Sequence, residues 1–156
     1  MKPPGWDKTQ TSAFQPKVIR VLLVEDSLAD ARLMQEMFLQ SKPTPYELIH
    51  VDDLAKAKLT LASEQIDLVL LDISLPDSHG LETFLRIHGQ APHVPVVVIT
   101  GLDDEELGFR SVQEGAQDYL VKGQVTGSLL ARSMRGRSRF CLQILLIPNL
   151  ISSWTN

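Results

Sequence analysis

Residues 66–72 read IDLVLLD, a short run of mostly apolar residues that ends at the carboxylate of Asp72. A run of this length that is apolar at nearly every position predicts a strand buried on both faces, as in a parallel sheet. Two other runs have the same character, VIRVLLV at 18–24 and PVVVIT at 95–100. The three runs therefore predict the central strands of one sheet.

More polar runs at 46–51 and 116–121 predict two edge strands, and each of the five strands is followed by a segment with helical signals. Strands that alternate with helices imply right-handed crossovers and a parallel sheet covered on both faces. The predicted fold is α/β, a flavodoxin-like doubly wound sheet of five parallel strands, with the strand order 2-1-3-4-5 that such sheets adopt. The expected helices cover about 27–40, 52–64, 80 onward, 103 onward and 126–134.

The bulk composition is that of an ordinary globular protein. The chain has 156 residues, of which 44% are hydrophobic, and its formal net charge is −4. This negative net charge gives no reason to expect direct nucleic-acid binding. The apolar stretch at 140–151 is shorter than the about 20 residues that a membrane-spanning helix needs, and no secretory signal is visible near the N-terminus. We therefore expect a cytoplasmic protein without membrane insertion.

The chain divides into three parts by composition. Residues 1–17 are rich in Pro, Thr and Gln without periodicity, which predicts a flexible N-terminal arm. Residues 18–138 hold the predicted α/β domain, and 139–156 form an atypical apolar C-terminal tail. Two interpretations of the tail stay open: a segment that covers the last helix or pairs with a second molecule, and a poorly ordered terminus.

Several carboxylates are interpreted as structural. Asp52 and Asp53 precede the second predicted helix, where short acidic side chains cap free N–H groups. Asp30 follows Ser27 by three residues, a spacing like that of a capping box at the start of the first helix. Asp77 is interpreted as a turn residue, because it follows a Leu-Pro pair after the third strand.

Another set of polar residues follows the predicted strands. They lie at the carboxyl ends of the strands, where open α/β sheets bind ligands. A gathering of three carboxylates needs a compensating cation, which Mg²⁺ or a lysine ammonium can supply. A carboxylate can also act as a nucleophile and form an aspartyl phosphate, and phosphoryl transfer depends mostly on positioning and charge neutralisation. The set comprises Glu25 and Asp26 after the first strand, Asp72 after the third, Thr100 at the end of the fourth and Lys122 after the fifth.

Four segments, in this order and spacing, resemble the motifs of response-regulator receiver domains: VLLVEDS, LLDISLPDSHGLE, VVVITG and DYLVKG. The resemblance extends over about residues 18–134. It implies that Asp72 is the phosphoacceptor, that Asp26 is the direct carboxylate ligand of Mg²⁺, and that Asp72 also belongs to the metal site. Glu25 would hold the metal largely through water, and the backbone carbonyl of Ser74 would supply another ligand.

The same resemblance implies that Lys122 contacts the phosphoryl group and that Thr100 and Tyr119 form a switch pair, the threonine moving toward the phosphate and the ring turning inward. The donor would be a sensor histidine kinase or a phosphotransfer protein, and the output would pass to a protein partner or through a homodimer. The chain would not be an enzyme beyond its own phosphorylation and slow dephosphorylation. Leu102 offers no group to orient an attacking water, so we expect a long-lived phosphoryl state.

Two alternative functions stay open. One is a degenerate receiver that acts as an interaction module without phosphorylation. The other is a flavin or nucleotide binder with the same strand order. Such a binder should present hydroxyls and backbone N–H groups to phosphate after the first strand, whereas the segment VEDSLAD presents carboxylates, which argues against it.

Overall fold

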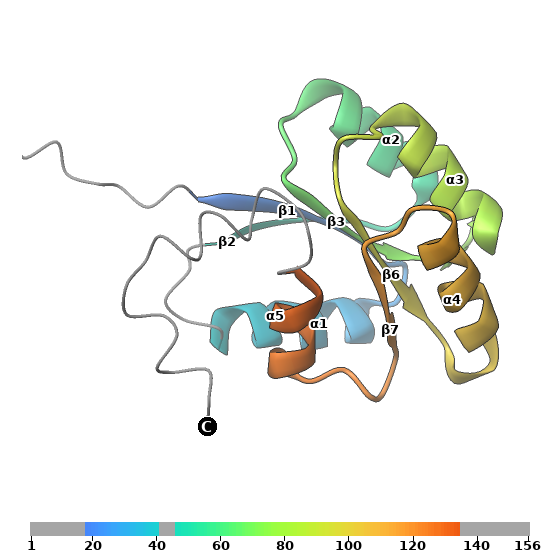
Figure 1. The fold of residues 1–156 in the computed structure, drawn as a ribbon. Coiled ribbons are helices and arrows are strands. Elements are labelled where there is room, and N and C mark those ends of the chain that lie inside the picture. Colours follow the sequence, from blue (N-terminus) through green and yellow to red (C-terminus); the bar gives the residue numbers. More distant parts are fainter. Residues whose placement is uncertain (1–17, 41–45, 135–156) are drawn as a thin grey trace, which may run out of the picture.

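The computed structural model describes residues 18–40 and 46–134. Five strands form one parallel sheet in the order β2-β1-β3-β6-β7, so the predicted order 2-1-3-4-5 is confirmed, with the second and fifth of these strands at the edges (Figure 1). The strands are β1 (Ile19–Val24), β2 (Tyr46–Val51), β3 (Leu68–Asp72), β6 (Val96–Thr100) and β7 (Asp118–Val121).

Helices cover both faces of the sheet, as the sequence predicts. Helices α1 and α5 lie on one face, and α2, α3 and α4 lie on the other (Figure 1). Each crossover therefore returns the chain to the end of the sheet at which every parallel strand begins. The helices are α1 (Leu28–Gln40), α2 (Leu54–Ser63), α3 (Leu81–Gln90), α4 (Glu105–Gln113) and α5 (Gly127–Met134), and a short 3-10 helix η1 (Leu102–Asp104) precedes α4.

The sheet separates two apolar cores. Successive side chains of a strand point to opposite faces, so Val21 and Leu23 pack with α1 and α5, whereas Leu22 and Val24 pack with α2 and α3. Every residue of β3 and β6 is buried. This burial on both faces is the reason that these segments are apolar at nearly every position.

Two strands begin two residues later than predicted. The third strand begins at Leu68 rather than at 66, and the last begins at Asp118 rather than at 116. The amide of Ala116 donates to the carbonyl of Ser111 at 2.9 Å, so this residue completes the end of α4 instead of extending the strand. The predicted arm 1–17 and tail 139–156 lie outside the described residues, as do 135–138. No helix in the described part of the chain is long and apolar enough to span a membrane.

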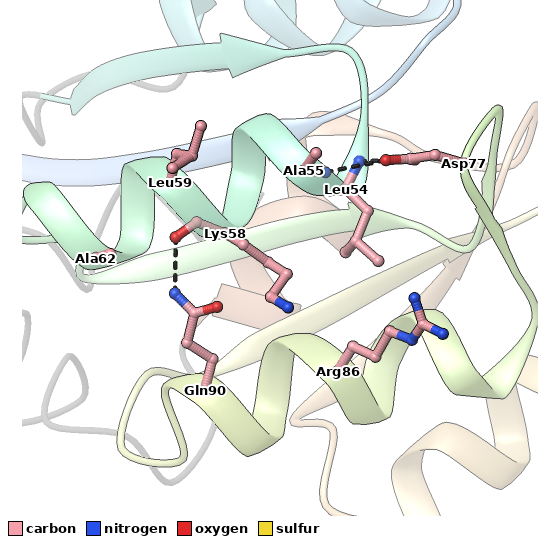
Figure 2. A pocket seen from close by; sticks show the side chains of 8 residues that line it. All are labelled: Leu54, Ala55, Lys58, Leu59, Ala62, Asp77, Arg86 and Gln90. Atoms are coloured by element: carbon pink, nitrogen blue, oxygen red, sulfur yellow. Dashed lines mark hydrogen bonds between the residues drawn. The ribbon is translucent and has the colours of Figure 1, made fainter.

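A small hairpin after β3 was not predicted. Strands β4 (Ser74–Leu75) and β5 (Ser78–His79) pair antiparallel, and Asp77 lies in the turn between them. The carboxylate of Asp77 accepts hydrogen bonds from the amides of Leu54 at 2.9 Å and Ala55 at 3.0 Å (Figure 2). Asp77 is therefore more than a turn residue, because it fastens the hairpin to the first turn of α2.

The predicted caps of α2 are confirmed in part. Asp53 is the N-cap residue, and its side chain accepts from the amide of Lys56 at 2.7 Å. Asp52 instead forms an ion pair with the ammonium of Lys56. Three of the free N–H groups at the start of α2 are thus satisfied by two carboxylates, one local and one from the hairpin.

We expect Asp77→Ala to lower the free energy of unfolding by about 1 kcal/mol, since two amides of α2 lose their acceptor. Chemical denaturation measures this change, and Glu36→Ala, at an exposed position inside α1, is the control. The amide of Leu54 holds the pKa of Asp77 below its usual 3.8, so the effect should shrink in more acidic buffer. A variant as stable as the control would contradict the capping role.

Candidate functional site

The predicted site residues lie at the carboxyl ends of the strands. Asp72 ends β3 and Thr100 ends β6, while Glu25 and Lys122 directly follow β1 and β7. The strands are parallel and in register, with Val24 beside Leu71, Asp72 beside Ile99 and Thr100 beside Val121. The carboxyl ends of four strands therefore deliver these side chains to the same crevice, as the sequence predicts.

Three carboxylates gather in this crevice. Glu25, Asp26 and Asp72 each offer one oxygen, and these three oxygens lie within 4.8 Å of one another. Glu25 and Asp72 are buried, whereas Asp26 is exposed to solvent. Oxygen donors of this kind suit a hard divalent cation, so these three residues could hold one.

Hydrogen bonds fix the carboxylate of Asp72. One oxygen, Oδ1, accepts from the amide of Ser74 at 2.8 Å, and Oδ2 accepts from Nζ of Lys122 at 2.9 Å. Ser74 begins the hairpin strand β4, so the chain turns sharply just past the carboxylate. The structure therefore places Ser74 beside the site through its amide, while the role of its carbonyl as a metal ligand stays a prediction.

The carboxylate of Glu25 is buried and incompletely satisfied. Its Oε1 accepts from the amide of Ser27 at 3.0 Å and from Nζ of Lys122 at 3.1 Å. Its Oε2 lies 3.0 Å from the same Nζ but accepts no hydrogen bond of suitable geometry. Burial, followed by the nearby charge of Asp72, raises the pKa of Glu25 to about 8. This buried oxygen thus has capacity for a further partner.

Lys122 joins the cluster with its ammonium. Besides Glu25 and Asp72, Nζ donates to Oδ2 of Asp30 at 3.0 Å. Burial disfavours the charged form, but hydrogen bonds to Asp72 and Glu25 outweigh it and hold the pKa of Lys122 above its usual range. From the sequence Asp30 is expected only at a helix start. Its contact with Lys122 has no sequence signal, because the two residues are 92 positions apart in the chain.

The predicted switch residues lie on adjacent strands. Thr100 is buried, and its hydroxyl donates to the carbonyl of Leu120 at 3.5 Å. The hydroxyl of Tyr119 donates to Oε1 of Glu105 on α4 at 3.3 Å. The ring fills the space beside Gly108, where an added Cβ would lie 2.6 Å from a ring carbon. The switch role of Thr100 and Tyr119 stays a prediction.

A separate groove of about 570 Å³ lies between α2 and α3 (Figure 2). Its lining includes Leu54 and Leu59 with the charged side chains of Lys58 and Arg86. None of the crevice carboxylates, nor Lys122, is part of this lining. Ionisable groups with perturbed pKa values cluster at functional sites. Glu25 and Lys122 are such groups, so we place the functional site at the carboxyl ends of the strands.

Comparison with known proteins identifies the family. Residues 21–133 match the sequence model described as the response regulator receiver domain. The chain therefore belongs to the receiver-domain family of two-component response regulators. The observed sheet order agrees with the flavodoxin-like fold expected of such a domain.

Curated relatives differ in how much of their length the chain covers. Response regulator Rcp1 of Synechocystis sp. is 34% identical over 142 residues, which is 85% of this chain and 94% of Rcp1. Swarming motility regulation protein RssB of Serratia marcescens is 31% identical over 114 residues, or 73% of this chain and 51% of RssB. The chain spans about half the length of RssB and of two transcriptional regulatory proteins of Escherichia coli that it also matches.

Solved structures show the same domain. The signal receiver domain of an HD domain-containing protein from Pseudomonas fluorescens Pf-5 is 29% identical, with a TM-score of 0.66 over 76% of this chain and 93% of that one. The phosphorylated cyanobacterial phytochrome response regulator RcpA is also 29% identical, with a TM-score of 0.63 over 76% of this chain and 90% of RcpA. The fold is therefore that of a receiver domain.

The raised pKa of Glu25 predicts how metal-free stability depends on pH. Between about 4.5 and about 8 the folded protein retains a proton that the unfolded chain has released, so the free energy of unfolding should fall as pH rises. Glu25→Gln cannot titrate and should lose this slope. Chemical denaturation across this pH window, in chelator, measures both slopes, and equal slopes would contradict the assignment.

Proposed function

We propose that this receiver accepts a phosphoryl group on Asp72, in a Mg²⁺-dependent reaction, from a phosphohistidine of a sensor kinase or a phosphotransfer protein. The phosphorylated state would then change which partner the domain binds. The observation that carries the proposal is the convergence of Lys122 and two further carboxylates, Glu25 and Asp26, on the buried side chain of Asp72.

The geometry around Asp72 supports the role of nucleophile. A carboxylate oxygen would form a bond to phosphorus while the bond between phosphorus and the donor imidazole nitrogen breaks, and the imidazole leaves with the electron pair. The ammonium of Lys122, 2.9 Å from Oδ2 of Asp72, is close enough to donate to an oxygen of the incoming phosphoryl group. It would neutralise part of the negative charge that arrives with that group.

The carboxylate cluster also fits Mg²⁺. All its donors are oxygens, and Oε2 of Glu25 is buried without a hydrogen bond, as expected of an oxygen whose partner is a metal or its water. Asp26 and Asp72 would be direct ligands, Glu25 would act largely through water, and the carbonyl of Ser74 would complete the protein's share. The bound ion would supply charge neutralisation for the phosphoryl oxygens.

We infer that Thr100 and Tyr119 would move in response to phosphorylation. The hydroxyl of Thr100 donates a long hydrogen bond to a backbone carbonyl, at 3.5 Å, so a phosphoryl oxygen could draw it away. The ring of Tyr119 is half-buried and is held to α4 by its hydroxyl contact with Glu105. Movement of the threonine would leave space behind it for the ring to turn inward, which would alter the surface beside α4.

The comparisons suggest where the signal comes from and goes. The relative RcpA is a phytochrome response regulator and was crystallised in its phosphorylated form. By analogy, this chain would act in the cytoplasm, its donor would be a sensor histidine kinase or a phosphotransfer protein, and the output would pass to a protein partner or a second copy. The domain would catalyse only its own phosphorylation and slow dephosphorylation.

Incubation with a small phosphodonor and Mg²⁺ should add one phosphoryl mass to the intact protein. The mass should be absent from Asp72→Asn and after chelation, because the nucleophile or the cation is then missing. Asp103→Asn, at an exposed position in η1, is the matched control and should gain the mass normally. No mass gain with any donor would favour a receiver that acts without phosphorylation.

The phosphorylated state should be long-lived. Leu102, which is 66% exposed, has a side chain without a carboxylate or amide to orient a water molecule for attack on the phosphoryl group. Leu102→Asn would add such a group and should shorten the half-life severalfold, measured by the decay of the phosphorylated mass. Leu59→Asn changes another exposed leucine, on α2, and should have no effect. A native half-life of seconds would refute this expectation.

A further inference from the structure

We propose that Asp30 is a positioning residue for phosphoryl transfer, because it completes the hydrogen bonding of the Lys122 ammonium and directs one of its protons to Asp72. This inference rests on the proposed function, since it assigns Asp30 a part in the same reaction. Asp30 does not touch the reacting carboxylate in the structure but acts through the lysine.

The contacts of Nζ account for all of its protons. An ammonium has three N–H donors, and Nζ donates to Glu25 at 3.1 Å, to Asp30 at 3.0 Å and to Asp72 at 2.9 Å. The three acceptors come from the end of β1, the first turn of α1 and the end of β3. Fixing two of the protons fixes the direction of the third, which is the one that faces the phosphoacceptor.

The start of α1 holds Asp30 in place. Ser27 accepts the amide proton of Asp30 on its hydroxyl at 3.3 Å, and its carbonyl accepts the amide proton of Ala31 at 2.9 Å. The side chain of Asp30 is 39% exposed, in contrast to 1% for Glu25 and 2% for Asp72. Asp30 is therefore the outer partner of the ammonium, on the side where water would otherwise bind.

This arrangement can persist through the reaction. When a phosphoryl group bonds to Asp72, the proton now directed at Oδ2 would pass to a phosphoryl oxygen, while Glu25 and Asp30 keep the other two. Without Asp30, one N–H would turn to water and the flexible lysine stem would sample more rotamers. The opposing effect is repulsion, because Asp30 adds negative charge near an anionic group. Positioning and repulsion predict opposite consequences of removing the side chain.

The test compares rates of phosphorylation with a small phosphodonor and Mg²⁺, followed by intact mass. Asp30→Ala should react roughly tenfold more slowly, the effect of losing one hydrogen bond to a charged group. Asp30→Asn should fall between this variant and the unmodified protein, because its amide oxygen can still accept from Nζ. Glu36→Ala, on an exposed position of the same helix, should react normally.

A second readout follows the ammonium itself. In protein with isotope-labelled lysine, NMR should detect the Nζ protons of an ordered Lys122, and Asp30→Ala should lose this signal through faster exchange with water. A purely structural role for Asp30 would instead lower thermal stability and leave the signal of the folded fraction intact. Asp30→Asn keeps the size of the side chain, so it carries the comparison if the alanine variant folds poorly.

The outcomes separate the two proposals. Slower reaction with loss of the ammonium signal supports the positioning role. Variants of Asp30 that react as fast as the unmodified protein, or faster, overturn that role and leave phosphorylation of Asp72 standing. If the unmodified protein gains no phosphoryl mass, the proposed function and the role of Asp30 both fail.

Discussion

Two carboxylates are buried at the carboxyl ends of the strands, and the ammonium of Lys122 compensates their negative charge. The side chains of Glu25 and Asp72 are only 1% and 2% exposed, and an unpaired charge in such a place is strongly unfavourable. Glu25 follows β1 and Asp72 ends β3, which are inner strands, whereas Lys122 follows β7, the outermost strand on one side of the sheet. Compensation therefore depends on the complete sheet, and the site forms only when the last strand is in place.

The central strands and the principal site residues could be predicted because their signals are local. The runs that became β3 and β6 are buried on both faces, so nearly every position is apolar and the pattern is unmistakable. Parallel topology then fixes where the strands end. For that reason Asp72 and Lys122 meet, with Thr100 at the end of the strand between them. The start of the edge strand β7 could not be predicted as well, because the amide of Ala116 donates to Ser111 of α4 and pairing with β6 begins only at Gln117.

What could not be predicted depends on contacts between distant segments. Asp30 and Asp77 both lie in places where a carboxylate has an ordinary local explanation, a helix start and a turn. Their actual partners are Lys122 and the amides at the start of α2, 92 and 22 to 23 residues away. The hairpin β4–β5 was missed because strands of two residues are too short to show alternation. A one-dimensional pattern cannot supply such pairings.

Gly108 places an evolutionary limit on α4. A glycine inside a helix costs about 1 kcal/mol relative to alanine, yet a Cβ here would lie 2.6 Å from a ring carbon of Tyr119 and 3.1 Å from the methyl group of Thr100. Alanine would strengthen the helix and displace the ring, so no replacement at this position is neutral for both. A substitution of Gly108 therefore requires a compensating substitution of Tyr119, and the two positions are expected to change together among descendants of this chain.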